Sequence, residues 1–185
     1  AETYLVRRDQ QGVRFLTARA CGLRMSGGRI TEVEIETKDG GRALVSGSSV
    51  VNAAGTRAAE VLRWAGLDLA VEPRKRTVFV VDAPNARHPD APLLIDAGFY
   101  LRPEHGHWIT ATVPQDDGPC DPNDFEPDLH LFEDVIWEQL YARAPGFDAV
   151  KVVRHWVGHY AYNTLDQNAI LGPHPHLPNL FLCNG

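Results

Sequence analysis

The sequence predicts an α+β fold built on a mostly antiparallel mixed sheet with helices. Residues 31–37 alternate between β-branched residues and glutamate, which is the period of a half-buried strand. Residues 77–81 form a continuous apolar run, and residues 150–162 form the longest stretch with strand character. Residues 128–144 instead carry apolar side chains at helical spacing, and Pro145 follows directly. Strands and helices mixed in this way indicate the α+β class.

The composition fits one globular domain or one and a half small ones, since 44% of the 185 residues are hydrophobic and 23% are charged. The formal net charge of −6 argues against a nucleic acid or an anionic membrane as the main partner. No apolar run approaches the roughly 20 residues of a membrane span. We also find no signal peptide pattern in the first residues.

The three cysteines indicate reduced thiols rather than a disulfide framework, because their number is odd and they lack metal-ligand spacing. The sequence therefore predicts a cytoplasmic protein. The chain begins without methionine and stops at Asn184-Gly185 directly after an apolar run. We therefore expect a fragment of a longer protein.

Residues 1–55 are predicted to form a β-meander, with turns at 26–28 and 38–41 where glycine supplies positive φ. Glu32, Glu34 and Glu36 would line a solvated face of one strand. The glycine-rich turns lack the strand–GxGxxG–helix context of a phosphate-binding loop.

A strand, a turn of small residues and a helix are predicted at residues 49–66. Val50 and Val51 would form a short, fully buried strand, Thr56 would cap the helix, and residues 57–64 would form it. A turn of small residues before a helix lets a ligand approach bare backbone N–H groups. Ordinary strand-to-helix packing explains the same pattern, so both interpretations stay open. The turn consists of Asn52, Ala53, Ala54 and Gly55.

A basic triplet and a single arginine are candidate anion-binding residues. The Arg-Lys-Arg triplet at 74–76 would either hold an anionic ligand or form a solvated strand entrance paired with nearby acids. Tyr100 and Arg102 share one face of the strand predicted at 99–102. If that face lines a cleft, Arg102 would clamp a carboxylate through its forked guanidinium, and otherwise it is a surface residue.

The sequence predicts no metal site. Acidic residues between 116 and 128 have a spacing that hints at calcium, but the glycine and the distal glutamate of an EF-hand loop are missing. We expect these acids to complement the dipole of the helix that follows them. The histidine pairs at 105/107 and 174/176 lie in Pro/Gly loops without acidic or cysteine partners nearby in sequence.

The strand at 150–162 places Trp156, Tyr160 and Tyr162 on one face, because side chains alternate along a strand. These aromatic residues would either pack as core against the 128–144 helix or border a space that holds an apolar or cationic amine. Gly158 lies between them and leaves room for a close approach.

Five segments follow one another in the order found in a single enzyme family: residues 50–55, 73–76, 99–103, 164–172 and 179–185. Together they resemble the D-amino-acid-oxidase-like family of FAD-dependent oxidoreductases, which includes glycine and sarcosine oxidases. The first resembles the strand and turn beside FAD, and the last resembles a strand that runs into a glycine-rich flavin-binding turn. One branch of the family is especially similar over residues 71–76, 162–164, 166–168 and 172–175.

The resemblance implies a division of the chain into parts of two domains. Residues 1–57 and 167–185 would belong to an interrupted FAD-binding domain, and residues 58–166 to a substrate-binding domain. FAD is the implied cofactor of the full-length protein. The implied cofactor contacts are Asn52, Ala53, Ala54, Gly55, Gly172 and Gly185. The implied substrate contacts are Tyr100, Arg102, Tyr160 and Tyr162.

The implied activity is the oxidation of a C–N bond in a small amine or amino-acid-like substrate, with hydride transfer to the flavin and no identifiable catalytic base. An electron-acceptor protein is an open second partner. The chain lacks the family's N-terminal GxGxxG, so we expect these residues alone to hold FAD weakly and to have little activity. Residues 159–162 also lack the carboxylate-binding arginine of some members. A non-catalytic flavin-fold assembly or binding factor is the alternative.

Overall fold

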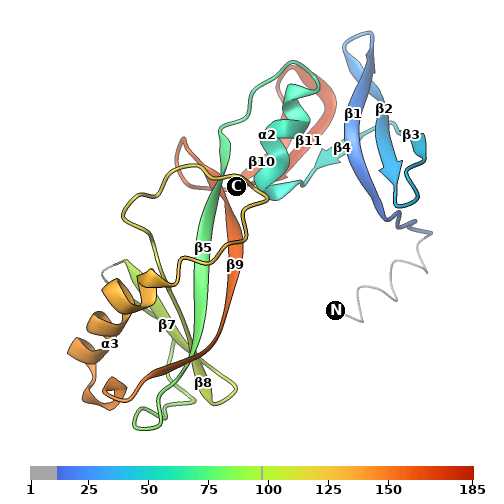
Figure 1. The fold of residues 1–185 in the computed structure, drawn as a ribbon. Helices are drawn as coiled ribbons and strands as arrows, with labels where there is room; N and C mark the ends of the chain where they lie inside the picture. Colours follow the sequence, from blue (N-terminus) through green and yellow to red (C-terminus); the bar gives the residue numbers. More distant parts are fainter. Residues whose placement is uncertain (1–11, 97) are drawn as a thin grey trace. The chain divides into compact units, whose positions relative to one another are not determined.

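The computed structural model describes residues 12–96 and 98–185, which form two compact units (Figure 1). The first unit comprises residues up to 53 together with 60–68 and 171–183. The second comprises residues 54–59, 69–170 and 184–185. The strands run in antiparallel and mixed sheets beside short helices, so the predicted α+β class is confirmed. The assignment of FAD-binding and substrate-binding domains stays a prediction.

The first unit contains the predicted meander. Strands β1 (Ala18–Ser26), β2 (Arg29–Thr37) and β3 (Arg42–Ser46) form an antiparallel sheet in the order β1-β2-β3. Two glutamates of the predicted solvated face stay partly exposed and pair with an exposed arginine. Arg24 on β1 pairs with Glu34 at 2.9 Å and with Glu32 at 3.9 Å, because antiparallel pairing brings these side chains together across the strands.

A second sheet combines β10 (Ile170–His174), β11 (Leu177–Asn184) and β4 (Val50–Asn52) in the order β10-β11-β4. β4 and β11 run parallel, with Leu182 opposite Asn52. The predicted full burial of the Val50-Val51 strand was wrong, since Val51 is 62% exposed. β4 is an edge strand of this sheet within the described residues, so it pairs with β11 on one edge only.

The predicted helix after β4 is present but shorter, and it begins differently. A 3₁₀ turn (Gly55–Arg57) leads into α2 (Ala58–Arg63). Thr56 was wrongly predicted as the cap, because it lies inside the 3₁₀ turn, Ala54 is the N-cap, and the turn has no side-chain cap hydrogen bond. Gly55 has a φ of 56°, a left-handed conformation that glycine adopts at little cost. A turn follows α2 and ends at Gly66, whose φ is 72°.

The second unit is built on a five-stranded antiparallel sheet with strand order β6-β7-β8-β5-β9. Its members are β5 (Val71–Asp82), β6 (Leu94–Asp96), β7 (Phe99–Glu104), β8 (His107–Thr112) and β9 (Lys151–Asn163). β5 and β9 pair over their whole length, which confirms the long predicted strand (Figure 1). β8 pairs with β5 only at residues 78–81.

One face of this sheet packs against the predicted helical region. The region contains a π-helix (Phe132–Ile136), α3 (Trp137–Arg143) and a 3₁₀ turn (Pro145–Phe147). The predicted helical stripe is correct at Ile136 and Leu140, which are buried, but wrong at Leu129, which is 50% exposed. Leu131 is buried instead, because the wider π-turn shifts the phase of the helix. The core joins these helices to Phe79, Val81, Phe99, Leu101 and Trp108.

The opposite face carries a smaller apolar cluster of Val78, Val80, Ile109 and Ala111, with Tyr100 packed against it. Trp156 and Tyr160 lie on the same face, because Trp156 is opposite Val78 and Tyr160 is opposite Arg74. Both aromatic side chains are exposed, at 42% and 57%. This second face is therefore open to a ligand. Within the described residues no helix is long and apolar enough to cross a membrane.

Candidate functional site

A cavity of about 700 Å³ lies on the open face of the five-stranded sheet. Its wall includes residues from β5, β7, β8 and β9 and from the segment that follows β8. The lining residues with polar or aromatic side chains are Arg76, Tyr100, Thr112, Asp117, His159, Tyr160, Tyr162 and Gln167. A cavity of this size and mixed lining fits a small molecule.

Three tyrosines form the aromatic part of the lining: Tyr100, Tyr160 and Tyr162, called here the tyrosine wall. The hypothesis that the aromatic residues of β9 pack beneath the helix was wrong, since the helix covers the other face and Tyr160 is 57% exposed. Burial raises the pKa of Tyr100, and the nearby charge of Arg102 partly offsets this effect. Its phenol therefore stays protonated near neutral pH and can donate a hydrogen bond.

A bidentate ion pair closes one part of the cavity. Arg76 donates to Asp117 through two parallel hydrogen bonds, Nη1 to Oδ1 at 2.7 Å and Nη2 to Oδ2 at 2.8 Å. The neighbouring Arg74 lies over the ring of Tyr162, with its guanidinium carbon 4.4 Å from the ring centroid, and pairs with Glu72 at 2.8 Å. Pairing of the basic triplet with acids is thus confirmed, but its solvation was wrong. The Arg74 and Arg76 side chains are only 14% and 19% exposed.

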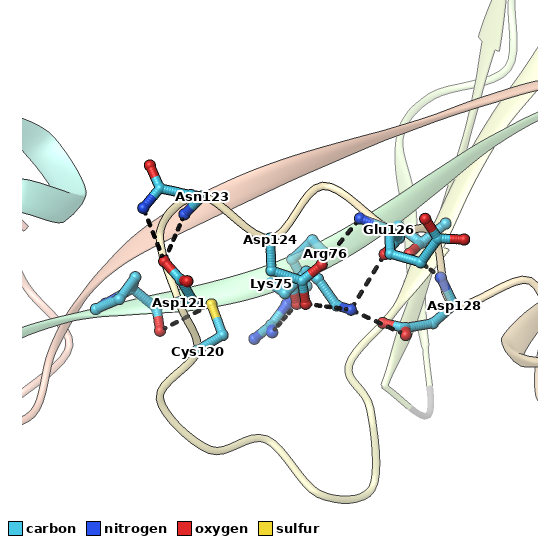
Figure 2. A network of polar contacts seen from close by, with 10 residues as sticks. Lys75, Arg76, Cys120, Asp121, Asn123, Asp124, Glu126 and Asp128 are labelled. Carbon is cyan, nitrogen blue, oxygen red and sulfur yellow. Dashed lines mark hydrogen bonds and ion pairs between the residues drawn. The ribbon is translucent and has the colours of Figure 1, made fainter.

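The third cation of the triplet faces the other way and holds the acidic segment, defined here as residues 113–128 (Figure 2). Lys75 Nζ lies 3.0 Å from Asp124 Oδ2 and 3.1 Å from Asp128 Oδ1, and it donates to the Glu126 carbonyl at 3.1 Å. These acids were wrongly expected to serve mainly the helix dipole. They pair with Lys75 because alternation along β5 points this side chain away from those of its two neighbours.

Backbone contacts show that the acidic segment runs along the part of β5 that β8 leaves unpaired. The Cys120 N–H donates to the Pro73 carbonyl at 3.0 Å, and the Asp128 N–H donates to Thr77 Oγ1 at 2.9 Å. Covering an open strand edge in this way protects it from pairing with another chain. The same segment supplies Val113 and Asp117 to the cavity wall. The acidic segment therefore links the stability of the β5 edge to the shape of the cavity.

Acid should loosen this attachment, and Asp124→Asn tests it. The Glu126 N–H, at 2.9 Å from Oδ1, and then the Lys75 ammonium lower the pKa of Asp124 from its ordinary value of 3.8. A lowered pKa in the folded state stabilises the fold above the ordinary value, and this contribution is lost as pH falls through the folded value. Asp124→Asn is therefore expected to lower the melting temperature near neutral pH, and its difference from the parent chain should shrink as pH falls below 3.8 through the lowered pKa.

The control for this experiment is Asp116→Asn, which removes an exposed carboxylate of the same segment. We expect its melting temperature to follow that of the parent chain at every pH. A difference between Asp124→Asn and the parent that persists unchanged into acid would contradict the assigned role of the carboxylate.

Arg102 lies on the same strand as Tyr100 but is not part of the cavity lining. Its guanidinium pairs with Glu104, and its side chain is 44% exposed. Glu104 also contacts His105 Nδ1 at 3.0 Å. The role of Arg102 as a carboxylate clamp stays a prediction. Its guanidinium is not buried, and it is held by the partly exposed carboxylate of Glu104.

The candidate cofactor residues share features that suit contact through the backbone. β4 and β11 run parallel and lead to Asn52–Gly55 and to Gly185, and the carboxyl ends of parallel strands are common ligand sites. Gly172 and Gly185 have φ values of 128° and 112°. A Cβ at Gly185 would lie 2.8 Å from the Asn168 carbonyl oxygen, so this position requires glycine. These residues fit a flavin-binding turn, and their contacts with FAD stay predictions.

Sequence reasoning missed Asp117 and His159. The acids of residues 116–128 gave no indication of which one would meet Arg76, because 41 residues separate that pair. The His159 ring packs edge-on against Phe125 at 4.7 Å, and its Nε2 atom is buried without a hydrogen-bond partner in the described residues.

The parts of the chain that the structure describes contain no group of three or more His, Cys, Asp or Glu able to hold a metal.

A family model described as "FAD dependent oxidoreductase" matches residues 3–185 of the chain. Two curated relatives are both described as "FAD-dependent oxidoreductase domain-containing protein 1". The Xenopus laevis protein is 40% identical over 152 residues, covering 75% of this chain and 30% of the relative. The Bos taurus protein is 35% identical over 150 residues, covering 74% of this chain and 31% of the relative. The chain thus spans about a third of the length of these relatives.

Solved structures with the same fold include L-proline dehydrogenase from P. horikoshii and glycine oxidase from Geobacillus kaustophilus. The first has a TM-score of 0.79 at 21% sequence identity, and the matched region covers 98% of this chain and 48% of the L-proline dehydrogenase chain. The second has a TM-score of 0.70 at 23% identity, with coverages of 91% and 42%. At these identities the likeness shows the shared fold alone.

Proposed function

The chain belongs to the family of FAD-dependent oxidoreductases, and from this premise we propose that the full-length protein oxidises a C–N bond of a small amine or amino-acid-like substrate. The cavity beside the tyrosine wall is the proposed substrate site. The open sheet face carries this proposal, because it presents aromatic rings, a phenol donor and a bidentate ion pair to one space of about 700 Å³. The solved proteins named as L-proline dehydrogenase and glycine oxidase support the substrate class by their shared fold.

The residues of this chain would bind and orient the substrate. The faces of the tyrosine rings attract a cationic amine, and the phenols can donate hydrogen bonds to its polar groups. Bound FAD supplies the hydride acceptor in this family, and we propose that residues 52–55, Gly172 and Gly185 contact it through their backbone. The apolar floor of Val78 and Ala111 would exclude water from the C–H bond that breaks.

A second candidate function is a flavin-fold binding or assembly factor without turnover. It is favoured by residues 159–162, which carry no arginine that could bind an amino-acid carboxylate beside the tyrosine wall. Fold alone does not separate the two functions. Anaerobic titration of the full-length protein with secondary amines separates the two functions, because reduction of the bound flavin requires substrate oxidation. An unreduced flavin across a broad amine series would favour the binding factor.

Tyr160→Phe tests whether the tyrosine wall acts on substrate. If the Tyr160 hydroxyl orients the amine, losing one hydrogen bond should slow flavin reduction about tenfold. The melting temperature should barely change, because the side chain is 57% exposed. Tyr141→Phe removes a hydroxyl of similar exposure from α3, on the other side of the sheet, and should change neither quantity. Loss of stability without loss of rate in Tyr160→Phe would assign the residue to packing.

A further inference from the structure

We propose that Gly158 determines which substrates fit the cavity, by leaving space for a bulky substituent on the amine. Gly158 lines the cavity from the middle of β9. An ideal Cβ at this position meets no heavy atom within 4 Å and would project into open space. This role of Gly158 rests on the function proposed above.

The strand itself does not require glycine at position 158. Glycine in a strand is normally explained by positive φ, a bulge or a close neighbouring backbone, and it otherwise weakens the strand. The β5–β9 register is shifted only between Val80 and Val81, far from the Gly158–Arg76 pair. Among the glycines of the described residues, Gly158 alone combines a φ outside the left-handed region with no atom near its Cβ position. A residue with a side chain would fit the backbone, so the advantage of glycine lies in the cavity.

The surroundings of Gly158 determine the kind of group that fits the space. Trp156 and Tyr160 flank it on the same face of β9, and Arg76 lies opposite on β5. Asp117 already accepts hydrogen bonds from both terminal nitrogens of the Arg76 guanidinium. The space therefore has aromatic sides and an internally neutralised polar end. This environment favours an apolar or aromatic substituent over a second carboxylate.

The experiment compares Gly158→Ala and Gly158→Val with the parent in the full-length, FAD-loaded protein. The probes are N-methylglycine and N-benzylglycine, which differ only in the group on nitrogen. Binding is measured calorimetrically and flavin reduction anaerobically. In Gly158→Val the affinity for N-benzylglycine should fall about tenfold or more, whereas that for N-methylglycine should change less than about twofold. The affinity of Gly158→Ala for N-benzylglycine should lie between those of the parent and of Gly158→Val.

Controls separate selectivity from folding. Gly118→Ala adds a methyl group to the acidic segment, where the Cβ would meet only Asp116 at 4.0 Å, and should leave both affinities unchanged. The melting temperatures of both Gly158 variants should equal or exceed that of the parent, because the strand favours a side chain. A lower melting temperature for Gly158→Ala, or equal losses for both probes, would overturn the proposal.

A further measurement needs no substrate. In Gly158→Cys, the new thiol should react with benzyl methanethiosulfonate nearly as fast as with the methyl reagent, since the space accepts a ring. Peptide mass mapping separates this thiol from Cys21, Cys120 and Cys183. Strong exclusion of the benzyl reagent would show that the space is absent and would reject the role of Gly158. Size-selective binding without flavin reduction would instead retain that role and reject the oxidase function.

Discussion

Phe79→Ala is expected to lower the free energy of unfolding of the chain by about 3–5 kcal/mol, the range for removing a buried aromatic ring. Phe79 is 1% exposed and its ring centroid lies 5.5 Å from that of Phe132. The residue therefore joins the sheet to the helical region. Removing the ring leaves a cavity between two elements that cannot easily approach each other, because the sheet is held by its strand pairing.

Urea denaturation followed by circular dichroism measures this effect. Leu129→Ala provides the control, because Leu129 precedes the same helical region but is 50% exposed, and its loss should change the free energy of unfolding by less than about 1 kcal/mol. Similar losses in the two variants would mean that Phe79 does not anchor the helices to the sheet.

The consequence of Phe79→Ala for the site depends on which side of the sheet it disturbs. Phe79 and Val78 are neighbours in β5 but point to opposite faces, one to the helices and the other to the open face. We therefore expect the tyrosine wall to survive in molecules that remain folded. The helices stabilise the sheet, and the sheet in turn holds the site.

Strand periodicity allowed the faces of β7 and β9 to be predicted from the sequence. Alternation alone places Trp156, Tyr160 and Tyr162 together, and the structure has them on one face. It does not indicate which face a helix will cover. That choice depends on Phe79, Val81 and Leu101, which lie on other strands, so the alternative of core aromatics could not be eliminated from β9 alone.

The spacing of residues in the sequence could not predict which residues pair across long stretches of the chain. The basic triplet alternates, so two arginines and one lysine point to opposite sides of β5, but the acids that pair with Lys75 and Arg76 lie 41 to 53 residues later. The Arg76–Gly158 pairing likewise follows from strand register, which needs the partner strand. The π-turn after Leu131 is also invisible to a helical-period argument, since it changes the period itself.

Replacement of Arg102 by alanine in the full-length protein is expected to raise the half-saturating concentration of an anionic amine substrate about 10- to 100-fold. Arg76 and Arg102 both lie on this side of the sheet, and they differ in how firmly they are held. Arg76 is 19% exposed and makes two hydrogen bonds to one carboxylate. Arg102 is 44% exposed and pairs with Glu104 on its own strand. An exposed pair of this kind contributes little, so a substrate carboxylate can replace Glu104.

Arg102→Lys separates charge from geometry. Lysine keeps the positive charge but loses the planar fork that binds both carboxylate oxygens, so it should restore part of the affinity and not all of it. Steady-state flavin reduction with N-methylglycine and with dimethylamine provides the comparison, because only the first probe carries a carboxylate. We expect Arg102→Ala to weaken N-methylglycine selectively and to leave dimethylamine unaffected. Equal effects on both amines, or none on either, would assign Arg102 to the protein surface and leave the cavity without a carboxylate clamp on β7.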